Sequence, residues 1–303
     1  MKTLILLILI LLILSGCDNF TSSARYTKDE YVITGLLYEG LPVEYIFIGK
    51  TISPYNDSYS DMNVPDADVV IKEFAGETLN DSIPLIYFQL EDSIGVYLDP
   101  DILIDPSSAK TISADYTYRI EVLIDGTLVS AETEIPEPIA FVDDPAFTED
   151  STAVFPQLDI DTADNEHPLK IQSQNTEPIN LLYRFYCLLD FEDHPQYIIS
   201  FGDHDTPEDE EEYENPADGF PRRIEFFGQY QPSEENGNFF VTESAYSGAI
   251  VFYGDYEISV FSVSENYYNY LYKTDGFKHG GIVNGYGYFG AVSGVNVYTE
   301  VVE

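Results

Sequence analysis

The sequence has few basic residues and few cysteines. Among its 303 residues, 13 Lys and Arg stand against 54 Asp and Glu, so the formal net charge is −41. Nucleic acids and anionic lipid headgroups are bound through clusters of Lys and Arg, and the charge therefore argues against both as partners. With 44% hydrophobic and 15% aromatic residues, the chain is still too apolar to be disordered as a whole. Its length fits one large domain or two ordinary ones.

Long hydrophobic runs are absent after the first fourteen residues. Residues 4–14 are an unbroken run of Leu and Ile, shorter than the about 20 residues that a membrane-spanning helix needs. The run ends in Leu14-Ser15-Gly16-Cys17, which matches the bacterial lipobox. We expect residues 1–16 to be a lipoprotein signal peptide and Cys17 to carry a lipid, so that acyl chains tether the protein to a membrane. The alternative is an ordinary signal peptide with a cysteine at this position by chance.

After a polar tether at residues 17–29, the pattern is mostly that of β-strands. Short runs rich in Tyr, Ile, Val and Phe alternate with Gly, Pro, Asn and Asp, and they predict strands at residues 31–37, 43–48, 68–74 and 85–90. The clearest unit lies at residues 116–134. Hydrophobic and polar side chains alternate there on both sides of Asp125-Gly126, a pair typical of a tight hairpin turn.

Two closely spaced prolines, Pro136 and Pro138, favour an extended connector because proline cannot donate to a sheet ladder. We place a linker at residues 136–140. It separates an N-terminal β-sandwich at 30–135, of the immunoglobulin or transthyretin-like kind, from a β-rich C-terminal domain at 141–303. The expected fold class is therefore all-β, with two β-sandwich-like domains.

One short helix is expected near the C-terminus, at residues 265–273 with Ser264 as its N-cap. Its Tyr267, Tyr270 and Leu271 form a stripe that would cover a sheet edge or face. Two further strands, at residues 286–292 and 295–302, are expected to follow it.

No motif in the sequence specifies a reaction. Residues 285–290 fit the pattern GxGxxG, but that pattern binds dinucleotides only where it opens a helix, and here a strand is expected. The sequence has no Gly-x-Ser-x-Gly nucleophile motif and no His-x₃-His zinc spacing. A carboxylate pair for glycoside hydrolysis can be drawn anywhere among 54 acids and is uninformative. We predict no catalytic residue, no cofactor and no metal site, and we do not expect an enzyme.

The acidic run at residues 203–218 leaves two interpretations open. Clustered carboxylates suit calcium, whereas mutually repelling charges favour a solvated loop. No Asp-x-Asp-x-Asp-Gly loop is present, so we predict a loop without a specific metal. A sparser acidic cluster, formed by Asp159, Asp161 and Asp164, has the same ambiguity. The four histidines are scattered along the sequence: His167, His194, His204 and His279. The other cysteine, Cys187, has no disulfide partner once Cys17 is acylated. A reactive thiol would need an electropositive, partly exposed setting, so Cys187 is expected to be a buried packing residue.

Several segments together resemble one known family. Behind the lipobox these are YVITGLL at 31–37, VPDADVVI at 64–71, YRIEV at 118–122, IPEP at 135–138, SENYYNYL at 264–271 and NGYGYFG at 284–290. The chain resembles the Bacteroidota lipoprotein family catalogued as domain of unknown function 4249, over about residues 25–295. The resemblance implies an outer-membrane lipoprotein near TonB-dependent transporters, and its motifs are structural, so no catalytic set comes with them.

Two functions of different class follow as hypotheses. The first is a non-catalytic module that binds a ligand or a transporter at the outer membrane, on its periplasmic or its cell-surface face. The second is a structural or adhesive envelope protein whose acidic surface mainly serves solubility. A concave, Tyr-lined pocket between the domains would favour the first, and a featureless elongated shape would favour the second.

Overall fold

The structure is a computed structural model, and it describes residues 30–51, 62–90, 95–142, 146–149, 157–159, 167–174, 176–189, 222–234 and 237–302. The expected signal peptide, the lipidation site Cys17, the tether and the acidic loop at 203–218 lie outside these ranges. Within the described ranges, no helix is both long enough and apolar enough to cross a membrane.

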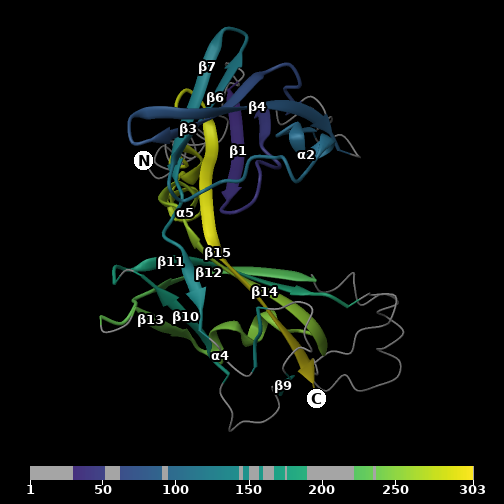
Figure 1. Cartoon of the computed structure of the whole chain (residues 1–303), viewed down its shortest axis with the longest axis vertical. Helices are drawn as coiled ribbons and strands as arrows, with labels where there is room; N and C mark the ends of the chain where they lie inside the picture. Colours follow the sequence, from purple (N-terminus) through teal and green to yellow (C-terminus); the bar gives the residue numbers. More distant parts are fainter. Residues whose placement is uncertain are drawn as a thin grey trace, which may run out of the picture.

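The fold is all-β, and its three sheets form an upper and a lower half (Figure 1). The largest sheet, in the order β12-β11-β14-β15-β1-β2 with β9 also paired to β15, extends through both halves. Its strands are β1 (Tyr31–Tyr38), β2 (Phe47–Lys50), β9 (Gln157–Asp159), β11 (Ile179–Cys187), β12 (Arg223–Tyr230), β14 (Gly254–Val263) and β15 (Tyr286–Val302).

Two smaller sheets pack on the large one. The upper, in the order β5-β4-β3-β6-β7, contains β3 (Asp68–Ala75), β4 (Thr78–Gln89), β5 (Gly95–Leu98), β6 (Thr117–Ile124) and β7 (Thr127–Glu134). The lower, in the order β13-β10-β8, contains β8 (Ile139–Phe141), β10 (Leu169–Ser173) and β13 (Asn238–Val241). Short helical segments lie between strands: α2 (Asp101–Ile104), α4 (Glu243–Tyr246), η6 (Ser247–Ala249), α5 (Glu265–Tyr272) and η7 (Gly276–Lys278).

Strand β15 is continuous over 17 residues, so the expectation of two separate strands at 286–292 and 295–302 was wrong. At about 3.3 Å per residue, it is long enough to run through both halves (Figure 1). Gly294 does not interrupt the strand but pairs with Phe261 of β14. A Cβ there would lie 1.9 Å from the carbonyl oxygen of Val260, so the glycine permits close approach of two strands rather than a turn.

Both hydrophobic cores lie on the same face of the large sheet. Side chains alternate along a strand, and odd-numbered residues of β15 contribute Phe289 and Ala291 to the upper core and Val297 and Val301 to the lower core. The chain passes from one core to the other at the proline segment, since Ile135 belongs to the upper core and Ile139 to the lower. Strands β1 and β15, one from each expected unit, pair in the large sheet. The independence of units at 30–135 and 141–303 stays a prediction.

Backbone hydrogen bonds join both edges of the five-stranded upper sheet to the large sheet. At one edge, Ile46 and Tyr97 exchange two backbone hydrogen bonds of 2.9 and 2.7 Å. At the other edge, Ser130 of β7 and Val283 exchange two more, of 3.2 and 2.7 Å.

The expected hairpin is confirmed. Strands β6 and β7 pair across Asp125 and Gly126, whose φ angles of 49° and 78° suit a tight turn.

Helix α5 is confirmed where the sequence predicted it, but the predicted stripe is partly wrong. Leu271 is 40% exposed, and Asn269 is buried in its place. The helix lies directly over Gly290 of β15, where a Cβ would come within 2.8 Å of the Cβ of Tyr267. This close approach turns the Tyr267 side of the helix to the sheet. Ser264 is the N-cap residue, as expected, but its hydroxyl accepts a hydrogen bond from the backbone N–H of Ala291 (2.9 Å) and none from the first turn of the helix.

Candidate functional site

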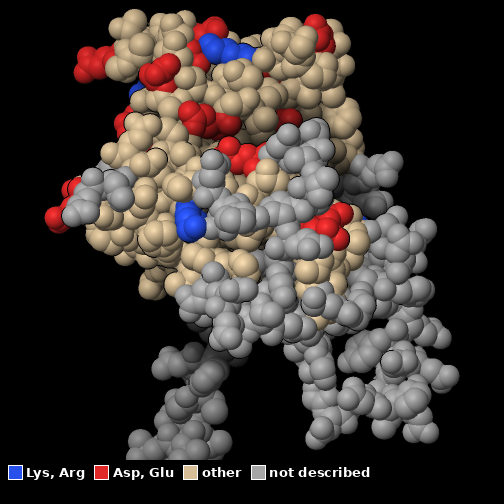
Figure 2. Space-filling view, turned by 60° about the horizontal axis from the view of Figure 1, so that its bottom comes forward, with Lys and Arg blue, Asp and Glu red and all other residues tan. Residues whose placement is uncertain are grey.

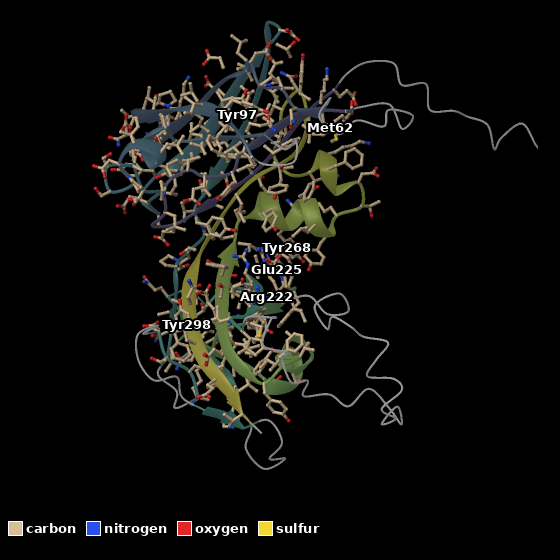
Figure 3. All side chains as sticks on the ribbon, turned by 90° about the vertical axis from the view of Figure 1, so that its right-hand side faces the viewer. Met62, Tyr97, Arg222, Glu225, Tyr268 and Tyr298 are labelled. Carbon is tan, nitrogen blue, oxygen red and sulfur yellow. The ribbon has the colours of Figure 1, made fainter. Side chains whose placement is uncertain are left out.

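The face of the large sheet opposite the two cores carries helix α5 and a second set of side chains. Even-numbered residues of β1 and β11 point to this side, where a small apolar cluster forms around Leu182, Val263 and Val292. Figure 3 shows Tyr268 of α5 and Glu225 of β12 on this side, at the level where the two halves meet. The long-range pairing of β1 with β15 aligns Thr34 with Tyr288 there.

A cavity of about 250 Å³, which we call the waist pocket, opens on this face. Strands β1, β11, β12 and β15, helix α5 and the loop between β1 and β2 all contribute to it. Its lining residues are Thr34, Gly35, Leu36, Tyr38, Leu41, Pro42, Glu44, Tyr45, Arg184, Arg223, Glu225, Tyr267 and Tyr288. The pocket is therefore concave, lies between the two halves and is rich in tyrosine.

A carboxylate and two guanidinium groups form the charged wall of the waist pocket. Arg184 and Glu225 face each other in the β11–β12 register, and Arg184 Nε donates to Glu225 Oε1 at 2.7 Å. Arg223 donates to the same oxygen through Nε (2.8 Å) and Nη2. Although partial burial opposes ionisation, these bonds lower the pKa of Glu225 below its usual value. Glu225 is therefore ionised at neutral pH.

Arg184 is held in place by aromatic residues as well. Its Nη2 donates to the hydroxyl of Tyr38 at 3.2 Å, and its guanidinium carbon lies 5.7 Å from the centre of the Phe261 ring. The Arg184 side chain is only 19% exposed, compared with 51% for Arg223. Arg184 is thus a fixed part of the wall, while Arg223 reaches toward solvent.

Tyrosine rings form the aromatic wall. The ring centroid of Tyr288 lies 4.9 Å from that of Tyr267 and 4.6 Å from that of Tyr270. Burial raises the pKa of Tyr267 to about 12, with a further contribution from nearby Glu225, and it raises the pKa of Tyr288 further. Both hydroxyls therefore keep their protons at neutral pH. Neither hydroxyl has a hydrogen-bond partner among the residues that the structure describes.

This arrangement has the polar and aromatic groups to bind a small molecule, and the pKa values of its titratable groups bear on what else it can do. A general acid or base works best when its pKa lies near the working pH. The pKa of Glu225 is lowered and the pKa values of Tyr267 and Tyr288 are raised, so all three move away from neutral pH. Aromatic faces with a few convergent polar groups are instead the usual lining of a binding site.

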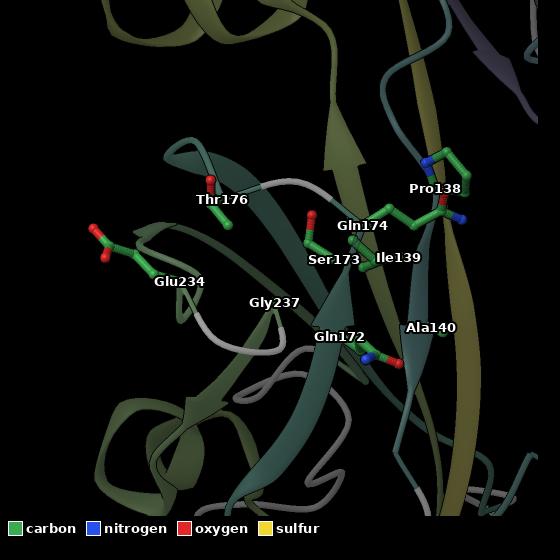
Figure 4. A pocket seen from close by; sticks show the side chains of 9 residues that line it. All are labelled: Pro138, Ile139, Ala140, Gln172, Ser173, Gln174, Thr176, Glu234 and Gly237. Carbon is green, nitrogen blue, oxygen red and sulfur yellow. The ribbon is translucent and has the colours of Figure 1, made fainter.

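A larger cavity of about 600 Å³ lies beside the proline segment (Figure 4). Its described lining comes from β8, β10 and the segments before β11 and β13: Pro138, Ile139, Ala140, Gln172, Ser173, Gln174, Thr176, Glu234 and Gly237. Glu234 is the one charged residue in this described lining, and no aromatic ring is part of it. Without converging charges or rings, this cavity is the weaker candidate despite its size.

A second polar cluster is built around Glu73 of β3, which is 1% exposed. Glu73 Oε1 accepts hydrogen bonds from Lys110 Nζ (2.8 Å) and from the Asn80 amide, and Oε2 accepts one from the Tyr118 hydroxyl (3.2 Å). Lys110 also contacts Asp81 at 2.7 Å. Both oxygens of the buried carboxylate are occupied, so we assign this cluster a structural role.

Of the candidate site residues from the sequence that the structure describes, Tyr288 of the GxGxxG segment lines the waist pocket, and the others are not brought together. Cys187 is confirmed as buried, and burial raises the pKa of its thiol. Residues 286–290 of the GxGxxG segment begin β15, as expected, and open no helix. Of the histidines, His167 and His279 are described and lie outside the waist pocket, while Asp161, Asp164, His194 and His204 fall outside the described residues. Within those residues, no group of three or more His, Cys, Asp or Glu is placed to hold a metal ion.

The sites predicted from the sequence do not include Arg184, Arg223 or Glu225. One signal was available: Arg184 interrupts an apolar strand in a chain with only 13 basic residues. Arg223 and Glu225 are two positions apart and so share a face of β12. The pairing of β11 with β12 joins these signals, and it cannot be read from the sequence.

The fold and the waist pocket define an all-β protein of two joined sandwich-like halves, with a polar and aromatic cavity on the sheet they share. The chain belongs to the family described as Domain of unknown function (DUF4249), whose model matches residues 18–296. A search of curated proteins found no match.

Proposed function

We propose that the protein is a lipid-tethered, non-catalytic ligand-binding module of the outer membrane. The waist pocket is the observation that carries this proposal, because it is concave, lies between the two halves and has Tyr38, Tyr45, Tyr267 and Tyr288 in its lining. A feature of this kind favours a binding module over a structural envelope protein. The lipobox ending at Cys17 supports the tether, which would consist of acyl chains.

A role beside a TonB-dependent transporter forms part of the same proposal. A protein anchored at Cys17 and a transporter in the same membrane meet at a high effective concentration. Even a weak contact would then suffice for the module to pass a ligand on. Crosslinking in intact envelopes should recover an outer-membrane β-barrel protein, and recovery of this chain alone would contradict the accessory role.

The second candidate is a structural or adhesive envelope protein, and the acidic surface favours it. Figure 2 shows Asp and Glu side chains spread over the described surface in that view, with few Lys and Arg among them. Such a charge keeps a protein soluble and separate from similar surfaces. It does not account for two arginines and several tyrosines gathered around one cavity.

The tether is tested by the variant Cys17→Ser. If Cys17 carries the anchor, the substitution should release the protein from the membrane fraction and abolish the acylated N-terminal peptide in mass spectrometry. Fractionation that does not change, together with an unmodified Cys17 in the wild-type protein, would contradict the proposal.

The binding role is tested with an introduced tryptophan, because the chain has none of its own. Tyr45→Trp in the full chain places a fluorophore at the rim of the pocket, where Tyr45 is 62% exposed. Tyr298→Trp in the lower half is the control, at a position away from the pocket (Figure 3). We expect some members of a chemically diverse fragment library to change the emission of Tyr45→Trp and not that of Tyr298→Trp. A library that changes neither would refute the binding role.

A further inference from the structure

The size of the waist pocket limits what it can hold. Its volume of about 250 Å³ lies below the range of about 300–1,000 Å³ that is usual for sites of drug-sized ligands. The pocket would therefore enclose one ring of a ligand, either a whole small molecule or the end of a larger one.

The charges in the described lining of the pocket cancel. Two guanidinium groups, Arg184 and Arg223, are balanced by two carboxylates, Glu225 within the wall and Glu44 at the exposed rim. An anionic ligand would meet Glu44 as well as the field of a chain with a net charge of −41. A cationic ligand would meet both arginines. The balance favours a ligand without net charge.

The polar groups of the pocket are nevertheless numerous and in part unused. Tyr267 and Tyr288 have hydroxyls without a partner among the described residues. All three arginine bonds to Glu225 end on Oε1, and Oε2 accepts none from a described residue. An apolar ligand would remove these groups from water without giving them partners, at a cost in free energy. The pocket therefore suits a ligand with many groups that both donate and accept.

Resting on the proposed binding function, we propose that the waist pocket takes one uncharged, polyhydroxylated ring: a neutral hexose, either free or at the end of a glycan. The hydroxyls of such a ring can donate to Glu225 Oε2 and exchange hydrogen bonds with Tyr267 and Tyr288. Its C–H face can pack on the tyrosine rings, which combine an apolar face with a polar tip. Its lack of charge matches the balance of the lining.

The test uses the full chain with Tyr45→Trp as reporter and a panel of sugars that differ in charge. The panel contains D-glucose, D-galactose and D-mannose, with D-glucuronate and D-glucosamine as charged analogues. We expect at least one neutral hexose to bind with a Kd on the order of 1 mM or below, and the charged analogues to bind at least about tenfold more weakly. An oligosaccharide ending in the bound hexose separates the two sources, since tighter binding of the oligosaccharide indicates a glycan end and equal binding indicates the free sugar.

A hydroxyl deletion tests whether the sugar occupies this pocket. In the reporter background, Tyr288→Phe keeps the ring and removes one hydroxyl that has no partner among the described residues, and it should weaken hexose binding about 2- to 10-fold. Tyr298→Phe removes a hydroxyl in the lower half and should leave the affinity unchanged (Figure 3). Equal affinities for neutral and charged sugars, or equal effects of the two substitutions, would overturn the proposal. If no sugar binds while fragments of another class do, the sugar proposal fails and the binding function stands; if nothing binds, both fail.

Discussion

Two glutamates in this protein have similar partners and different surroundings. Glu73 in the upper half and Glu225 at the waist each contact a basic side chain, and each has tyrosines close by. Glu73 is 1% exposed and both its oxygens are bonded, whereas the Glu225 side chain is 32% exposed and accepts hydrogen bonds from described residues through one oxygen only. The first cluster is closed and the second opens onto a cavity. A polar cluster therefore indicates binding through the hydrogen-bonding atoms that it leaves without partners, and not through the residue types that it contains.

The largest expected effect comes from breaking the closed cluster. Lys110→Met would leave the buried carboxylate of Glu73 without a cation and should lower the free energy of unfolding by about 3–5 kcal/mol. Lys72→Met is a matched control, because Lys72 is also 30% exposed and pairs with a glutamate in the same sheet. Its partner Glu121 is 27% exposed, so the control should cost only about 0–1 kcal/mol. Urea unfolding of both variants measures the difference, and equal losses would show that the burial of Glu73 does not matter.

Next in size is the effect of changing the open cluster. Glu225→Gln keeps the shape of the side chain and removes its charge, so hexose affinity should fall about tenfold while stability changes by about 1 kcal/mol or less. Glu121→Gln removes a carboxylate of similar exposure on the upper sheet and should leave the affinity unchanged. Titration of both variants in the Tyr45→Trp background tests this. A rise in affinity for D-glucuronate with Glu225→Gln, without any loss for neutral hexoses, would indicate an anion site instead.

A smaller effect concerns the tyrosines near both clusters and in the two cores. Burial raises the pKa of Tyr97 and of Tyr267 to about 12, and it raises the pKa of Tyr118, Tyr183 and Tyr256 as well. Below about pH 10, both folded and unfolded chains keep these protons, so stability does not depend on them. Between about pH 10 and 12 the unfolded chain loses protons first, and stability falls as the pH rises. Urea midpoints measured from about pH 9 to pH 11 should decline, and Tyr267→Phe should flatten the decline. A constant midpoint would contradict the burial of these hydroxyls.

The sequence predicted local features well, because each depends on neighbours along the chain. The hairpin at Asp125 and Gly126 and helix α5 follow from turn chemistry and spacing, and the burial of Cys187 follows from its apolar surroundings in the chain. The continuity of β15 did not follow, because a glycine that permits close approach and a glycine that ends a strand look the same in one sequence. Glu73 occupies an inward position after Val69 and Ile71, but one acid among 54 gives no reason to single it out.

The waist pocket depends on contacts between distant segments. Tyr288 joins Thr34 only through the parallel pairing of β1 with β15, and Arg184 joins Glu225 only through β11 and β12. Alternation along each strand predicts which side chains share a face, but it does not say which strands are neighbours. For this reason, the 25 tyrosines of the sequence do not by themselves indicate a site.

The most direct test measures stability and hexose affinity in parallel for Lys110→Met and Glu225→Gln. The account predicts opposite outcomes: Lys110→Met loses about 3–5 kcal/mol of stability and keeps the affinity of the pocket, whereas Glu225→Gln keeps its stability and binds the hexose about tenfold more weakly. If Glu225→Gln destabilises the fold as much as Lys110→Met and leaves the affinity unchanged, Glu225 is a second structural carboxylate and the central claim is contradicted.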